Sequence, residues 1–83
     1  MQNIPPIPSN SFRITVNLDY AEKRMDKVLL QALQNQDENA ELKKMTRALM
    51  KSLFAKGKIM IKGQRARPSS ALAKGTTYID ILI

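Results

Sequence analysis

The side chains best placed to do chemistry in this sequence are the cations of its second half. Between residues 42 and 79 every charged side chain is a lysine or an arginine. A field of one sign attracts polyanions, because each phosphate that it neutralises releases condensed counterions. Nucleic acid is therefore the first candidate ligand, and the alternatives are an acidic membrane surface or a basic face that only maintains solubility. The cations are Lys43, Lys44, Arg47, Lys51, Lys56, Lys58, Lys62, Arg65, Arg67 and Lys74.

Groups suited to catalysis are scarce. The 83 residues include no histidine and no cysteine, which removes the usual general base, the usual metal ligands and the usual thiol nucleophile. The sequence also has no glycine-rich phosphate loop and no pair of acids outside structural positions. We therefore expect a chain without catalytic machinery, without a cofactor and without a metal.

The composition is that of a small folded domain. Hydrophobic residues make up 43% of the chain and charged residues 25%, as in ordinary globular proteins. Because there is no cysteine, packing alone must hold a thin core together. The first residues lack the basic start and apolar run of a secretory signal, and no later segment has the length of a membrane span. We expect a monomeric, cytoplasmic protein that does not bind membranes.

The first half of the chain predicts a lead-in, a strand and a helix. Residues 1–11 hold three of the four prolines, so we expect a flexible lead-in before a domain at residues 12–83. Apolar and polar residues alternate over 12–18, as in a half-buried strand. Asp19 and Glu22 have the spacing of a capping box, which predicts that a helix begins at Asp19. The apolar stripe of that helix is Met25, Val28, Leu29, Ala32 and Leu33.

A second helix is predicted over residues 46–56. Either Asn39 or Thr46 could cap a helix here, so a short turn before it is an alternative that the pattern leaves open. Gly57 suits the left-handed position that closes a helix. The angular spacing of 100° per residue predicts a core face and, nearly opposite, an exposed basic face. The predicted core pair is Leu49 and Leu53, and the predicted exposed pair is Arg47 and Lys51.

The remaining residues predict a hairpin and a closing strand. Residues 59–61 read as a short strand, Lys62-Gly63 as a tight turn, and residues 64–67 as the returning strand, which Pro68 ends. Residues 77–83 alternate as a final strand. The order predicts an α+β domain in which two main helices pack on a small antiparallel sheet.

Several motifs follow one another at a characteristic spacing. Residues 24–29 (RMDKVL) match an Arg-Leu-Asp-x-x-Leu pattern with one apolar exchange, and residues 57–63 (GKIMIKG) match Gly-x-Val-x-Val-Asn-Gly. Between and after them stand Thr46-Arg47, Pro68-Ser69, Leu72 and Lys74-Gly75. Together these motifs resemble the S-four RNA-binding domain, a family named after the fourth protein of the small ribosomal subunit. The resemblance covers about residues 12–83.

The resemblance implies an S-four-like (αL) fold that contacts structured RNA through two helices and a hairpin. Two departures stand out: Lys62 replaces the asparagine of the hairpin, which brings any base contact of that asparagine into question, and Thr76 replaces an aspartate. Arg24 has an alternative role as the ion-pair partner of Asp26 or Asp19, and Thr46 an alternative role as a helix cap. The matched contact positions are Arg24, Thr46, Arg47, Lys51 and Lys62, to which charge alone adds Lys58, Arg65 and Arg67.

The order of Arg13 to Leu18 and Arg24-Met25-Asp26 is most similar to the N-terminal domain of pseudouridine synthases that modify large-subunit ribosomal RNA. In that family a separate catalytic domain, absent from these 83 residues, performs the isomerisation. Two alternatives remain open at this stage. One is a stand-alone S-four protein, similar to the small heat-shock protein that binds large ribosomal subunits, and the other is a module that docks an acidic protein.

Overall fold

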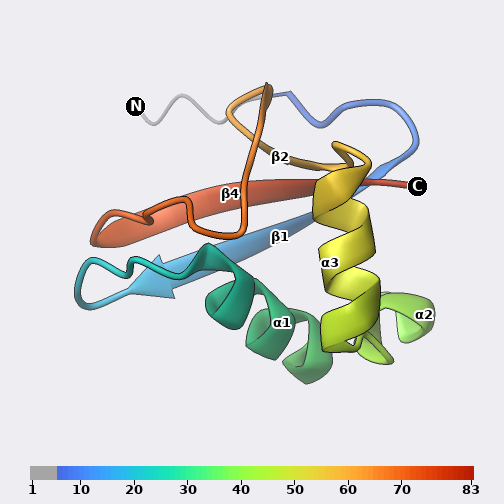
Figure 1. Cartoon of the computed structure of the whole chain (residues 1–83), viewed down its shortest axis with the longest axis horizontal. Coiled ribbons are helices and arrows are strands. Elements are labelled where there is room, and N and C mark those ends of the chain that lie inside the picture. Colours follow the sequence, from blue (N-terminus) through green and yellow to red (C-terminus); the bar gives the residue numbers. More distant parts are fainter. Residues whose placement is uncertain (1–5) are drawn as a thin grey trace.

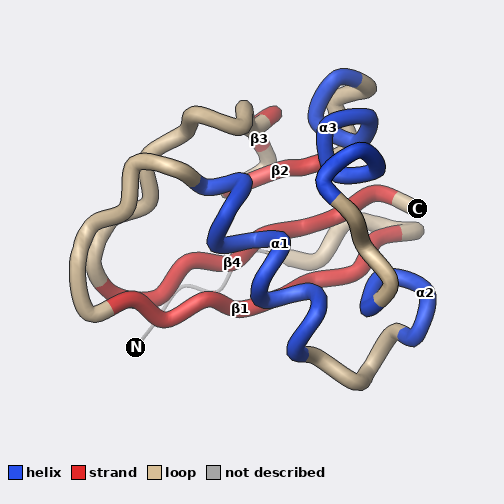
Figure 2. Tube along the Cα trace, turned by 60° about the horizontal axis from the view of Figure 1, so that its bottom comes forward, coloured by secondary structure: helices blue, strands red, loops and turns tan. Residues whose placement is uncertain are grey.

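The computed structural model describes residues 6–83, and in this range four strands form an antiparallel sheet with three helices on one of its faces (Figures 1 and 2). The expected α+β class is thus confirmed. Residues 1–5 of the predicted lead-in lie outside the described residues. The elements are β1 (Ser11–Leu18), α1 (Met25–Asn35), α2 (Ala40–Lys43), α3 (Arg47–Ala55), β2 (Ile59–Ile61), β3 (Gln64–Arg65) and β4 (Gly75–Leu82).

Strand β4 is central in the sheet, whose order is β1-β4-β2-β3. It pairs with β1 over the full length of both, and with β2 through Ile59 opposite Ile81. Because side chains alternate along a strand, every second residue points toward the helices, and those near the middle of the sheet are buried. The buried core residues of the sheet are Ile14, Val16, Ile59, Ile79 and Ile81, and the helices add Met25, Leu29, Leu33, Met50 and Phe54.

Strand β1 begins at Ser11, one residue before the domain start expected from the sequence. The preceding residues are tied to the domain by hydrogen bonds. The backbone N–H of Ile83 donates to the carbonyl of Asn10 at 2.7 Å, and the Ser11 hydroxyl donates to the carbonyl of Pro8 at 2.5 Å. The part of the lead-in that the structure describes therefore lies against the sheet.

The prediction that the first helix begins at Asp19 is wrong, since α1 begins at Met25. Glu22 is not part of a helix: its backbone exchanges two hydrogen bonds with Leu72, at 2.8 and 2.7 Å. The Glu22 carboxylate accepts from the backbone N–H groups of Lys23 and Arg24 at 3.0 and 3.3 Å. Pairing with a distant segment thus keeps residue 22 extended, where a local pattern predicted the first turn of a helix.

Helix α3 follows the prediction at its ends but not on its faces. The Thr46 hydroxyl accepts from the backbone N–H of Leu49 at 3.2 Å, so Thr46 is the N-cap. Its buried residues are Met50 and Phe54, whereas Leu49 is 54% exposed. The prediction that Leu49 belongs to the core face is therefore wrong, whereas Leu53 is partly buried and packs against the core. The centre of the buried face lies one residue further along, about 100° around the helix axis.

A compact turn joins α3 to the hairpin of β2 and β3. Gly57 has φ 69°, and the N–H groups of Gly57 and Lys58 donate to the carbonyls of Phe54 and Leu53, which is the Schellman arrangement. The next turn has φ 53° at Lys62 and 75° at Gly63, both left-handed as a type I′ hairpin requires. The sequence predicted both turns correctly.

Candidate nucleic-acid interface

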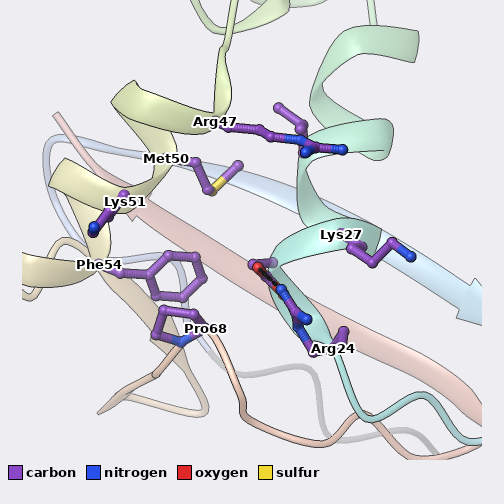
Figure 3. A pocket seen from close by; sticks show the side chains of 9 residues that line it. Arg24, Lys27, Arg47, Met50, Lys51, Phe54 and Pro68 are labelled. Atoms are coloured by element: carbon purple, nitrogen blue, oxygen red, sulfur yellow. Dashed lines mark hydrogen bonds and ion pairs between the residues drawn. The ribbon is translucent and has the colours of Figure 1, made fainter.

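A groove runs between α1, α3 and the segment that follows β3. It consists of two adjoining hollows that share Lys51, Phe54 and Pro68. The first hollow, between the helices, has a volume of about 530 Å³ (Figure 3). Its cations are Arg24, Lys27, Arg47 and Lys51, and its apolar wall is formed by Leu30, Met50, Phe54 and Pro68.

The position of the buried face of α3 explains why Arg47 and Lys51 reach this groove. These two residues are four apart and therefore neighbours on the helix, and each lies three residues before one of the buried residues Met50 and Phe54. They border the core face instead of lying opposite it. Figure 3 shows the Arg47 side chain extending toward α1, and Lys51 lines both hollows. Both residues are exposed, as the sequence predicted.

Arg24 lies on the other side of the first hollow, at the start of α1. Its guanidinium donates to the Asp26 carboxylate through Nε at 3.0 Å and Nη2 at 2.8 Å. This hydrogen-bonded pair lowers the pKa of Asp26 below its usual range and raises the pKa of Arg24. The alternative role proposed for Arg24, an ion pair with Asp26, is therefore observed, and it coexists with a place on the groove.

Arg65 has a structural role that its charge did not reveal. Its Nη2 donates to the backbone carbonyls of Phe54 and Ala55 at 3.3 and 2.8 Å, which ties the hairpin to the C-terminal end of α3. The Phe54 carbonyl also accepts from the Gly57 N–H, and a cation at this C-terminal end of the helix is favourable. A Cβ on Gly57 would approach Arg65 Nε to 3.2 Å, so the glycine also leaves room for this contact.

The structure brings some of the predicted contact residues together and leaves others apart. Arg24, Arg47 and Lys51 line the first hollow, and Arg65 and Arg67 join Lys51 in the second. Three predicted residues line neither hollow: Thr46, which caps α3, Lys58, which is half-buried beside β2, and the exposed Lys62 of the hairpin turn.

Sequence reasoning missed Lys27 and Pro68. Lys27 was not among the predicted contact residues, but it lies about one turn after Arg24 and lines the first hollow. That i, i+3 spacing was the available signal. Pro68 was interpreted as the end of a strand and as part of the Pro68-Ser69 motif, but not as a contact residue. Its carbonyl accepts from the N–H of Asp26 at 3.3 Å, which holds the segment after β3 against the start of α1.

The electrostatics of the groove favour an anionic ligand. The only acid among its lining residues, Asp26, is already paired with Arg24. Within residues 6–83, no carboxylate lies within ion-pair distance of Arg47 or Lys51. Their charges therefore face the hollows without a protein counterion, and an incoming phosphate would meet them directly.

Two further observations concern the described part of the chain. Across residues 6–83, acidic side chains do not gather in a group of three or more that could hold a metal ion. In the same range, each helix is too short or too polar to cross a membrane.

Comparisons with known proteins add no relative. We found no family model, no curated protein and no solved structure that matches the chain.

Proposed function

We propose that this chain binds structured RNA, ribosomal RNA in particular, through the groove between α1 and α3, as an S-four-like RNA-binding domain. The observation that carries the proposal is the placement of Arg24, Lys27, Arg47 and Lys51 around one hollow, although they belong to two helical segments that are separate in the sequence. A basic surface that served solubility alone would not require the cations to surround one hollow.

RNA fits this arrangement better than DNA does. The major groove of B-form DNA takes an inserted helix or ribbon. The basic residues of α3 instead border hollows that α1 and the segment after β3 also line, so α3 is not a free helix of that kind. A-form RNA instead presents phosphates and 2′-hydroxyls along a shallow groove, which a rigid basic surface recognises by shape. The six arginine and lysine side chains that line the groove suit such a backbone. They are Arg24, Lys27, Arg47, Lys51, Arg65 and Arg67.

The larger task that we propose is substrate recognition for a pseudouridine synthase that modifies large-subunit ribosomal RNA. Its support is the resemblance of residues 13–18 and 24–26 to the N-terminal domain of those enzymes. In such an assembly this domain holds the RNA and a separate domain carries the chemistry. Reading the open reading frame beyond Ile83 tests this proposal. We expect it to continue into a catalytic domain, whereas a stop codon after Ile83 would favour the stand-alone alternative.

The double variant Arg47→Ala/Lys51→Ala tests the interface. We expect it to weaken binding to a ribosomal RNA hairpin by about 2 kcal/mol or more, the worth of lost charge-assisted hydrogen bonds, without unfolding the domain. Fluorescence anisotropy measures the affinity, and a thermal melt checks the fold. In wild type the affinity should also fall steeply with salt, as expected when about 4 to 6 phosphates are neutralised.

A matched control removes the same charge from elsewhere. Lys44 and Lys74 are exposed and line neither hollow, so Lys44→Ala/Lys74→Ala lowers the net charge equally without touching the groove. Equal losses in the two double variants would show that only net charge matters and would refute the groove as the interface. Tighter capture of an acidic protein than of the RNA hairpin would favour a protein-docking module.

A further inference from the structure

We propose that the first hollow of the groove holds a single unpaired nucleotide of the RNA, with the base inside the hollow and its phosphates against the surrounding cations. This inference rests on the proposed function and gives it a specific ligand: a bulged or looped-out nucleotide in place of a uniform duplex. Three features of the hollow carry it, namely its volume, its apolar wall and its one carboxylate.

The volume of the hollow exceeds what phosphate binding needs. At about 530 Å³ it lies within the range of about 300–1,000 Å³ that is typical of sites for small organic molecules. The backbone of an A-form duplex is convex and its bases are stacked inside, so a perfect duplex would touch the outer cations and leave the hollow filled with water. A nucleotide that has left the stack can enter it.

The apolar wall favours a ring over a phosphate. Figure 3 shows the Phe54 ring beside Pro68, with Met50 on the same side of the hollow. Phe54 and Met50 are themselves buried, whereas Pro68 is exposed and presents its ring to the solvent. An unpaired base covers such a surface with its π-face, and contacts of this kind tolerate any base. A phosphate would gain nothing from it.

The carboxylate of Asp26 is the third feature. A negative charge in the wall of a phosphate site is unfavourable, but each Asp26 oxygen that accepts from Arg24 keeps a further lone pair. The other N–H groups of Arg24 are donors beside it. An acceptor and a donor side by side match the edge of a base, which carries an amino or imino N–H next to a ring nitrogen or a carbonyl oxygen.

The experiment compares three RNA duplexes of one sequence. One is perfectly paired, the second contains a single bulged adenosine, and the third contains an abasic nucleotide at the bulge, which keeps the phosphate and removes the base. We expect the adenosine bulge to bind about tenfold more tightly than the abasic bulge, the effect of one stacked base. The abasic and perfect duplexes should bind alike.

Two proline variants locate the effect. Pro68→Ala removes the exposed ring but keeps the carbonyl that accepts from Asp26, so it should abolish the preference for the adenosine bulge over the abasic bulge. Pro8→Ala, outside the groove, is the matched control and should keep the preference. If Pro68→Ala fails to fold in a thermal melt, the comparison of adenosine with abasic bulge in wild type decides alone.

The outcomes separate this inference from the proposed function. Equal affinity of wild type for all three duplexes, still dependent on Arg47 and Lys51, would overturn the nucleotide site and leave the RNA interface standing. Absence of binding to every duplex and to the ribosomal RNA hairpin would overturn both. A preference for the adenosine bulge that survives Pro68→Ala would place the base elsewhere and would also overturn the inference.

Discussion

Two arginine–aspartate pairs of this domain share one geometry and differ in their surroundings. Arg13 donates to Asp80 through Nε at 2.7 Å and Nη2 at 2.9 Å, and Arg24 donates to Asp26 in the same two-pronged manner. The side chains of the first pair are 9% and 3% exposed, and those of the second are 58% and 24% exposed. Hydrogen-bond geometry does not distinguish the two pairs, but the exposure of their side chains to solvent does.

The two locations explain the difference. Arg13 and Asp80 are cross-strand partners of β1 and β4 on the face of the sheet away from the helices, where the guanidinium also lies 5.4 Å from the Tyr78 ring centre and donates to the carbonyl of Pro6. Arg24 and Asp26 are two residues apart beside an open groove. A buried pair is coupled to the stability of the fold, whereas an exposed pair remains able to contact a ligand.

The largest expected effect breaks the buried pair. Asp80→Ala leaves the Arg13 charge buried without its carboxylate, which should lower the free energy of unfolding by about 3 kcal/mol. Urea denaturation monitored by circular dichroism measures this loss. Replacing both partners, as Arg13→Met/Asp80→Leu, should recover most of it, because no charge is then left buried. A loss no larger than that of Asp26→Asn under the same conditions would contradict the contrast between the pairs.

The second expected effect concerns binding at the exposed pair. Arg24→Ala should weaken the affinity for structured RNA by about tenfold, the worth of one charge-assisted hydrogen bond, while the unfolding curve stays close to that of wild type. Anisotropy and urea denaturation on the same sample provide both measurements. A large loss of stability with unchanged affinity would reverse the roles assigned to the two pairs.

The smallest expected effect is a pH dependence at Asp26. Because Arg24 lowers the pKa of Asp26 in the folded state, the pair stabilises the fold above the unfolded pKa of about 3.9 and loses that contribution as the pH falls through the lower folded value. Wild type should therefore lose more stability than Asp26→Asn between neutral pH and about pH 2.5. Parallel curves for the two proteins would show that the pair contributes nothing to folding.

Local chemistry predicted the elements with special backbone requirements. Gly57 and Gly63 stand where left-handed conformations occur, and Thr46 caps α3, because each of these residues satisfies a need of its own few neighbours. Alternation located β1 and β4 to within about two residues, as their core contacts repeat with the period of the strand.

Local sequence patterns could not predict contacts between residues that are distant in the chain. The start of α1 is displaced because Glu22 pairs with Leu72, fifty residues further along the chain. The buried face of α3 was misplaced because Met50 and Leu49 are equally apolar, and only the position of α1 decides which of them is covered. For the candidate site, charge identified Arg47 and Lys51, whereas the hollow between them and α1 depends on how two helices pack.

The central position of β4 has a consequence for the order of assembly. Because β4 pairs with both β1 and β2, strand β1 has no neighbour in the sheet until the last of the four strands has been synthesised. Pairing of β1 with β4 joins segments that are far apart in the sequence, and such pairing is slow compared with the formation of local turns and helices. We expect α3 and its hairpin to be structured early and the docking of β1 to limit the rate of folding, so the basic elements would take shape before the sheet that supports them is complete.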